Sequence, residues 1–313
     1  MKNLVFLLTF LLLLSFTDKG KHWYNSKNYR CKYHTNEGRL DGKYTSFYNN
    51  GKKKAQGLFN NNNRTGIWSV WDEKGKLMLQ RNYSNPFEFT ILYPAIAKNP
   101  KSGYKFERDS IGCYKHPDIY PEKILAAFRK WRIIEPAFNP SLFEDSRLFL
   151  LVNDLVIKQK VRVYTDDSLK GIKKIADMND REFRVVAFKT MEDWFVDDDR
   201  LTAEKYTVAI SPMVVYKNTT DTISFYWLEL NELRPFLVKE RLHSPLLPET
   251  IRNLDDVFFL HYFHGRINKS FHFAEDHTHY LQIYDPVNEA LRIELDAIDY
   301  EHRLWVELLN KQQ

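Results

Sequence analysis

The sequence repeats itself between residues 38 and 84. Glycines recur at a spacing of 24, as Gly42 and Gly51 in the first copy and as Gly66 and Gly75 in the second. In each copy aromatic residues precede an Asn-Gly or Lys-Gly turn, and a second stretch of alternating residues follows. Because glycine readily adopts the positive φ that such turns need, each copy is typical of a β-hairpin. The sequence therefore predicts two consecutive hairpins.

The predicted hairpins carry four candidate aromatic side chains, Tyr44, Tyr48, Trp68 and Trp71. A single hairpin cannot bury such rings, whereas stacked repeats share one apolar face. The segments "DGKYTSFYNNGKKKAQGLF" and "TGIWSVWDEKGKLMLQRNY" resemble MORN-like repeats of the YwqK type, in which hairpins stack into an extended sheet. The resemblance implies architecture and says almost nothing about function. Since two copies are few for a solenoid, we expect the module to pack against a neighbouring segment of the chain or against a partner protein.

The chain opens with the pattern of a secretory signal. One lysine precedes an apolar run from Leu4 to Leu14, and small residues followed by charge come after it. The run is too short to span a bilayer comfortably, so we expect residues 1–17 to be a signal peptide and the mature chain to be exported. An uncleaved N-terminal anchor is the alternative.

The rest of the chain is long enough for two domains. Residues 18–84 form the predicted hairpin module, residues 85–119 a proline-interrupted linker and residues 120–313 a second domain. Ser141 and Glu144 have capping-box spacing at one predicted helix start. The predicted helices are 121–131, 141–158, 254–265 and 285–309, and the predicted strands are 181–188, 204–212 and 222–230. This order predicts an α+β fold, with a β-hairpin repeat module followed by an antiparallel sheet and flanking helices.

Charge and cysteine content exclude some functions. The 46 basic and 41 acidic residues are interleaved through most of the chain, and the net charge is only +5, so we expect no nucleic-acid partner. Cys31 and Cys113 are the only cysteines, and in an oxidising compartment they form either one disulfide or none. Neither has the sequence signature of a catalytic thiol around it, and we assign neither a nucleophilic nor a metal role.

The stretch "MEDWFVDDDR" places four aspartates around a Trp-Phe pair, namely Asp193, Asp197, Asp198 and Asp199. Neighbouring carboxylates can move protons or bind a hard cation. However, the three consecutive aspartates fall between two predicted strands, where aspartate is favoured because its side chain stabilises turns. We therefore interpret the cluster as a hairpin turn.

Half of the ten histidines lie close together, as His261, His264, His272, His277 and His279. With Asp255 or Asp256 they could form the metal site of an exported enzyme. Their spacing matches no metal-binding signature, and no serine or cysteine nucleophile motif is present. The sequence thus predicts a protein that is not an enzyme and that has no metal and no cofactor.

Several stretches of the second domain, taken in order, resemble the gliding-motility protein family GldN, also called PorN. They include "EKILAAFRKWRII", "FRVVAFKTMEDWFVDDDRLTAEKYTVAISPMV", "FYWLELNELRPFLVKE", "LDDVFFLHYFHGRINKS" and "EALRIELDAIDYEHRLWVEL". The resemblance covers residues 120–309. It implies a non-enzymatic periplasmic building block of the type IX secretion and gliding machinery. It also implies assembly with an outer-membrane lipoprotein of the GldK/PorK type and with further copies of the chain, so that membrane association is indirect.

The chain departs from the family in the segment "RIIEPAFNP" and in carrying the hairpin module, as a specialised relative would. Candidate interface or core anchors are Trp131, Arg132, Trp194, Phe195 and Trp305. Tryptophan and arginine anchor many large interfaces, but they also occur in ordinary cores. The alternative function is an exported binding module whose aromatic hairpins hold a peptide, a glycan or an envelope partner.

Overall fold

The computed structural model describes residues 20–25, 30–36, 38–85, 88–93, 107–116, 118–173, 182–197, 203–243, 247, 249–273, 277–280 and 286–311. The chain forms two compact units. The repeat unit draws on segments 1–104, 198–201 and 283–313, and the central unit on segments 105–197 and 202–282. The predicted signal peptide lies outside the described residues. Among the described residues, no helix is long and apolar enough to cross a membrane.

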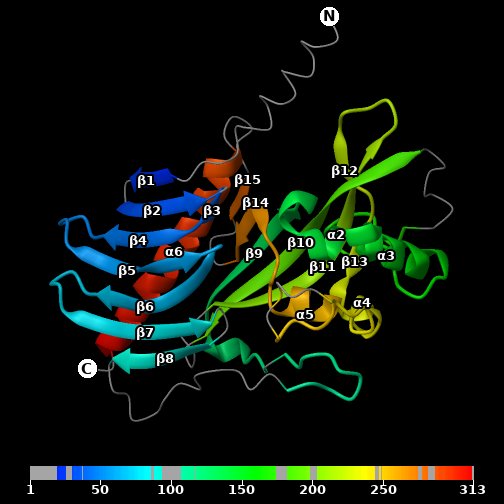
Figure 1. Cartoon of the computed structure of the whole chain (residues 1–313). Coiled ribbons are helices and arrows are strands. Elements are labelled where there is room, and N and C mark those ends of the chain that lie inside the picture. The colour runs from blue at the N-terminus through cyan, green and yellow to red at the C-terminus, as the bar shows by residue number, and fades with distance from the viewer. Residues whose placement is uncertain are drawn as a thin grey trace, which may run out of the picture. The chain divides into compact units, whose positions relative to one another are not determined.

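The repeat unit contains an eight-stranded antiparallel sheet (Figure 1). Its strands are β1 (Gly20–Asn25), β2 (Arg30–Asn36), β3 (Arg39–Leu40), β4 (Gly42–Phe47), β5 (Lys53–Asn60), β6 (Asn63–Trp71), β7 (Leu77–Asn85) and β8 (Glu88–Tyr93). Their order is β1-β2-β4-β5-β6-β7-β8, and β3 pairs with β2. The two predicted hairpins are confirmed as β4 with β5 and β6 with β7.

The turns of the two hairpins have the backbone that their glycines favour. Gly51 and Gly75 have φ values of 83° and 90°, in the region that side chains with a Cβ rarely occupy. The turns also bind each other, because the Tyr48 hydroxyl donates a 2.7 Å hydrogen bond to the backbone oxygen of Trp71. Successive repeats are therefore joined through their turns as well as through their strands.

A long C-terminal helix, α6 (Pro286–Lys311), lies across one face of this sheet (Figure 1). The helix itself was expected from the sequence and is confirmed. Its position against the hairpins gives their aromatic side chains the cover that two repeats alone lack.

The central unit is built on a seven-stranded sheet of order β12-β11-β10-β9-β14-β15, with β13 paired to β11. The strands are β9 (Ile124–Ile134), β10 (Phe183–Asp197), β11 (Ala203–Tyr216), β12 (Thr222–Ser224), β13 (Leu228–Glu229), β14 (Gly265–His272) and β15 (His277–Tyr280). The α-helices are α2 (Pro140–Phe143), α3 (Arg147–Ile157), α4 (Leu230–Leu237) and α5 (Leu254–Phe259). The predicted α+β class is confirmed.

The predicted helix over residues 121–131 is wrong. Only Pro121–Lys123 forms a short 3₁₀ turn, and Ile124–Ile134 is strand β9, which pairs with both β10 and β14. The apolar spacing and the leading proline favoured a helix locally. Pairing on both edges in the middle of a sheet outweighs that local preference.

Three other predicted boundaries also change. The capping box at Ser141 and Glu144 is not formed, because Asp145 and Ser146 have positive φ and α3 begins at Arg147. The predicted helix 254–265 ends at Phe259. The predicted strand 222–230 is divided between β12 and β13, and α4 starts at its last residue. Local turns therefore interrupt apolar patterns that are continuous in the sequence.

Gly57 provides a test of the packing in the repeat sheet. A Cβ atom at this position would stand 2.2 Å from the Trp68 ring. We predict that Gly57→Ala destabilises the repeat unit by about 1–3 kcal/mol through overpacking. Hydrogen exchange of the β4 to β7 amides under denaturant measures this change. Leu58→Ala removes a side chain that is 47% exposed and should cost less than about 0.5 kcal/mol, so equal losses would contradict the packing argument.

Candidate functional site

A cluster of charged and aromatic side chains lies where α6 meets the sheet of the repeat unit. We call it the helix seam, made of Tyr44, Lys54, Arg64, Trp68 and Arg81 from the strands and Asp299, Glu301, His302 and Trp305 from the helix. Spacings of three residues along α6 place Asp299, His302 and Trp305 on one side of the helix. The seam therefore joins the predicted hairpins to the last segment that resembles GldN.

An ion pair buried in the seam joins Lys54 to Asp299. The lysine Nζ lies 2.6 Å from Oδ1 of the aspartate, and the two side chains are only 6% and 5% exposed. Burial lowers the pKa of Lys54, and the attraction of Asp299 opposes that shift. Arg303, one turn further along α6, also contacts Asp299 at 3.3 Å. A charge pair held this far from water is costly to break by removing one partner.

A second ion pair in the seam is enclosed by aromatic rings. Arg64 donates to both carboxylate oxygens of Glu301, at 3.3 and 2.7 Å. Its guanidinium lies 5.1 Å from the ring centroid of Trp68 and 5.3 Å from that of Trp305. Planar stacking and paired donors are properties of arginine that lysine does not share, so this position is specific for arginine.

Two of the four candidate repeat aromatics are buried in the seam. Tyr44 is 0% and Trp68 is 1% exposed, and their ring centroids lie 5.5 Å apart. Tyr48 and Trp71 are partly buried beside the hairpin turns. Tyr44 and Trp68 therefore bind the chain's own helix and are not available to an external partner.

The sheet of the central unit holds a buried charge network. Arg132 donates to Glu192 at 3.1 Å, and Glu192 also accepts from Thr190 at 2.8 Å and from the Trp194 indole at 3.1 Å. Burial alone would raise the pKa of Glu192, but Arg132 and these hydrogen bonds outweigh it and hold the pKa at about 2. The network keeps an ionised carboxylate inside the sheet and ties β9 to β10.

Most of the candidate anchors lie in the interior of their own unit. Trp131, Arg132, Trp194 and Trp305 are 5%, 7%, 6% and 0% exposed, and Phe195 is partly buried. Lys130, also buried, places its Nζ 3.6 Å from the Trp194 ring centroid. In the single chain these residues act as core.

In the acidic cluster at the end of β10, the structure describes the side chain of Asp193, which is paired. Asp193 accepts two hydrogen bonds from Arg129, at 2.6 and 2.7 Å. Asp197 is the last residue of β10, and the following two aspartates lie outside the described residues. The carboxylate of Asp193 thus serves to pair neighbouring strands.

The histidines of the cluster lie in several segments, and His272 of β14 is the register partner of His277 of β15. His261 follows α5 with a positive φ of 51°, and burial lowers its pKa to about 4, which leaves it neutral. The backbone of His264 exchanges two hydrogen bonds of 2.7 Å with the Asn139 side chain. His272, His277 and His279 lie in β14 and β15. Among the residues that the structure describes, no three metal-ligand side chains converge.

The two aspartates considered as metal ligands bind arginines instead. Asp255 accepts from Arg234 at 2.8 and 3.0 Å, and Asp256 accepts from Arg108 at 2.9 Å. Asn253 caps the start of α5 by accepting from the Asp256 amide at 3.0 Å. Sequence inspection missed the roles of Arg108 and Arg234, because neither is near its partner in the chain. The sequence feature that could have indicated these ion pairs is the adjacent acids Asp255 and Asp256 at the start of a predicted helix.

The two cysteines are buried in different units, and the structure contains no Cys31–Cys113 disulfide. Burial raises the pKa of Cys113 to about 12, and its thiol donates to the backbone oxygen of Arg234 at 3.6 Å. A thiol that holds its proton this strongly is a poor nucleophile.

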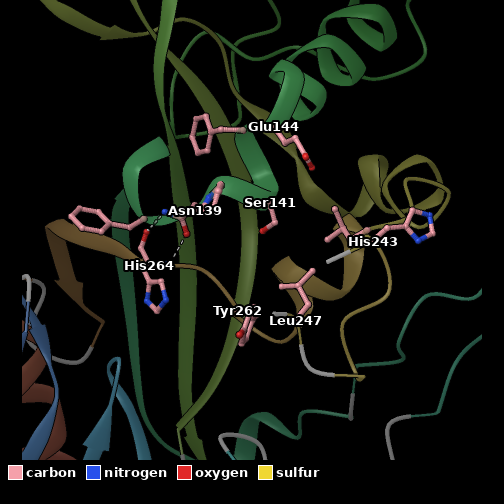
Figure 2. A pocket seen from close by; sticks show the side chains of 11 residues that line it. Asn139, Ser141, Glu144, His243, Leu247, Tyr262 and His264 are labelled. Carbon is pink, nitrogen blue, oxygen red and sulfur yellow. Dashed lines mark hydrogen bonds between the residues drawn. The ribbon is translucent and has the colours of Figure 1, made fainter. Parts of the chain in front are cut away.

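An open groove of about 650 Å³ lies beside α2 in the central unit (Figure 2). Apolar side chains such as Phe138, Leu242 and Leu247 line it together with Ser141 and Tyr262. The Asn139–His264 hydrogen bonds fix one wall, as the dashed lines in Figure 2 show. The lining mixes apolar and polar side chains in similar measure, so the groove can receive a side chain of another molecule through both kinds of contact.

The Lys54–Asp299 pair generates a test of the helix seam. We predict that Lys54→Met or Asp299→Asn alone destabilises the repeat unit by about 3–5 kcal/mol, because each leaves a buried charge unpaired. A double-mutant cycle, read by denaturant unfolding, should show a coupling of about 1–3 kcal/mol. The matched exposed pair, Lys158 and Asp154, should show less than about 0.5 kcal/mol. Equal coupling energies in the two pairs would contradict the claim that the buried Lys54–Asp299 pair stabilises the repeat unit more than an exposed pair does.

The carboxyl group of Glu204, which is buried in β11, should make the stability of the central unit depend on pH. Burial raises the pKa of Glu204 to about 8, so the folded state keeps a proton that the unfolded chain releases near 4.5. This stabilisation is full below pH 4.5 and is lost as the pH rises through 8. We expect the unfolding free energy of the central unit to fall by roughly 2–4 kcal/mol between pH 5 and 9.

The variant Glu204→Gln should remove most of this dependence, since the amide is neutral throughout. Denaturant unfolding at several pH values measures it, and Glu182→Gln is the control, because the Glu182 side chain is 74% exposed. The same pH slope in the native protein and in Glu204→Gln would exclude Glu204 as its cause.

Sequence comparison finds two families in the chain. Residues 128–306 match the family described as Gliding motility associated protein GldN, and residues 40–61 and 64–85 match the family described as MORN repeat variant. No curated protein matches the chain. The resemblance expected from the sequence is therefore confirmed in both regions. Since the first match covers more than half of the chain, the protein belongs to the GldN family of gliding motility associated proteins.

Proposed function

We propose that the protein is a non-enzymatic, periplasmic structural component of the type IX secretion and gliding machinery, which assembles with a GldK/PorK-type outer-membrane lipoprotein. The observation that carries the proposal is the GldN match over residues 128–306. That match includes the paired strands of the central unit and most of α6. Copies of the chain would assemble side by side, and the membrane contact would be made through the lipoprotein.

The use of the charged side chains supports a structural role. The carboxylates that looked suited to chemistry, Asp193, Asp255 and Asp256, each accept hydrogen bonds from an arginine on another segment. Glu192 is held ionised by Arg132 inside the sheet. Groups used in this way fix the distance between segments, which is what a rigid building block requires.

The groove beside α2 is the place where we expect the partner to insert an apolar side chain. It is open, and its lining comes from segments that the central unit holds firmly, as the Asn139–His264 contacts show. Anchors of protein interfaces commonly fill preformed pockets of this kind. The alternative role, a module that grips a ligand with its hairpin aromatics, is weakened because Tyr44 and Trp68 lie under α6.

Affinity isolation of the tagged protein from its own cell envelope tests the proposal. We expect a GldK-like lipoprotein in near-equal amount in the eluate, measured by quantitative mass spectrometry. Ser141→Trp should fill the groove and reduce that recovery at least about tenfold, which is the effect of losing one anchor. Leu150→Trp is the control, because Leu150 is 58% exposed on α3 and does not line the groove.

The outcomes separate the two parts of the proposal. Recovery of the protein without any lipoprotein would contradict assembly with this partner. Full recovery from Ser141→Trp cells would keep the partner and reject the groove as its docking place.

A further inference from the structure

Positive charge is concentrated in the repeat unit. Between Gly20 and Asn85 the sequence has thirteen lysines and arginines against four aspartates and glutamates. None of the strands β1 to β7 contains an acidic residue in its described range. Lys54 and Arg64 form ion pairs with Asp299 and Glu301 of α6.

The sheet has a second face, opposite α6. Side chains of a strand alternate between faces, so the inward Tyr44 places Lys43 and Thr45 outward, and the inward Trp68 places Ile67 and Ser69 outward. Strand register then aligns one outward row across six strands, Trp23–Lys32–Thr45–Gln56–Ser69–Gln80. We call this surface the open face.

The open face combines lysines with separate apolar side chains. Trp23, Leu58 and Ile67 are 52%, 47% and 54% exposed. The Lys32 Nζ lies 4.8 Å from the Trp23 ring centroid, so the edge of the row presents a cation and an aromatic ring together. Lys43 stands opposite Leu58 in the register and is exposed.

We propose that the open face docks an extended acidic segment of a partner protein. The lysines of these strands, whose described ranges contain no acidic residue, create a positive field that attracts and orients such a segment. The partly exposed hydroxyl and amide side chains of Gln56, Ser69 and Gln80 can exchange hydrogen bonds with a peptide along the row. Trp23 supplies an apolar contact at one edge.

A membrane surface suits the open face less well than a peptide does. Insertion into lipid would remove water from the polar row of Gln56, Ser69 and Gln80, which is unfavourable for groups without lipid partners. The exposed apolar side chains are also separated by polar ones, whereas interfacial segments present a continuous apolar face. The proposed docking does not depend on the groove in the central unit or on the identity of the lipoprotein.

Binding of a fluorescein-labelled poly-L-glutamate peptide to the full chain tests the proposal. The triple variant Lys32→Glu, Lys43→Glu and Lys53→Glu should weaken binding at least about tenfold at low salt. The control triple, Lys160→Glu, Lys170→Glu and Lys239→Glu, makes the same charge change at exposed lysines of the central unit and should change binding less than about twofold. Fluorescence anisotropy measures both.

A second variant distinguishes binding at a specific surface, with an apolar contact, from non-specific electrostatic attraction. Trp23→Ala should weaken binding about threefold at both low and physiological salt, because an apolar contact is not screened. Equal losses in the two lysine triples, or no loss in Trp23→Ala, would overturn the proposal. Tighter binding to phosphatidylglycerol vesicles than to the peptide would also overturn it and would assign the face to a membrane.

Discussion

The fold of the repeat unit depends on buried opposite charges that attach a helix to a sheet. Two hairpins cannot bury Tyr44 and Trp68 by themselves, and α6 supplies the missing cover. Burial of lysine and arginine under a helix is favourable only when acids meet them, as Asp299 and Glu301 do. Apolar contact thus provides the area, and the ion pairs fix how the helix lies on the strands.

In the central unit, too, largely buried basic side chains are paired with acids. Arg132 meets Glu192 inside the sheet, and Arg234 meets Asp255 at the start of α5. The stretches that resemble GldN contain these residues, in "EKILAAFRKWRII", "EDWF", "LRPF" and "LDDVFF". The region that matches the family therefore contains a buried framework of charges and rings, which suits a component of the gliding and type IX secretion machinery that must keep its shape.

Local patterns predicted the elements that are locally determined. The hairpin turns, with glycine at positive φ, and the long amphipathic helix α6 were both visible in the sequence. Strand β9 was mistaken for a helix, because its two sheet partners are remote in the chain. The seam was missed for the same reason, since Lys54 and Asp299 are far apart in sequence and no spacing rule relates them. Likewise, the residues next to Trp68 in the sequence do not indicate that a distant helix of the same chain covers its ring.

The covering of the hairpins by α6 also has a kinetic consequence. During synthesis or export from the N-terminus, the hairpin strands emerge first and the helix that completes their core emerges last. Until then the rings and basic side chains of the seam stay in water, and the contacts that close the unit have very long sequence separation. The repeat unit should accordingly complete its folding after the central unit.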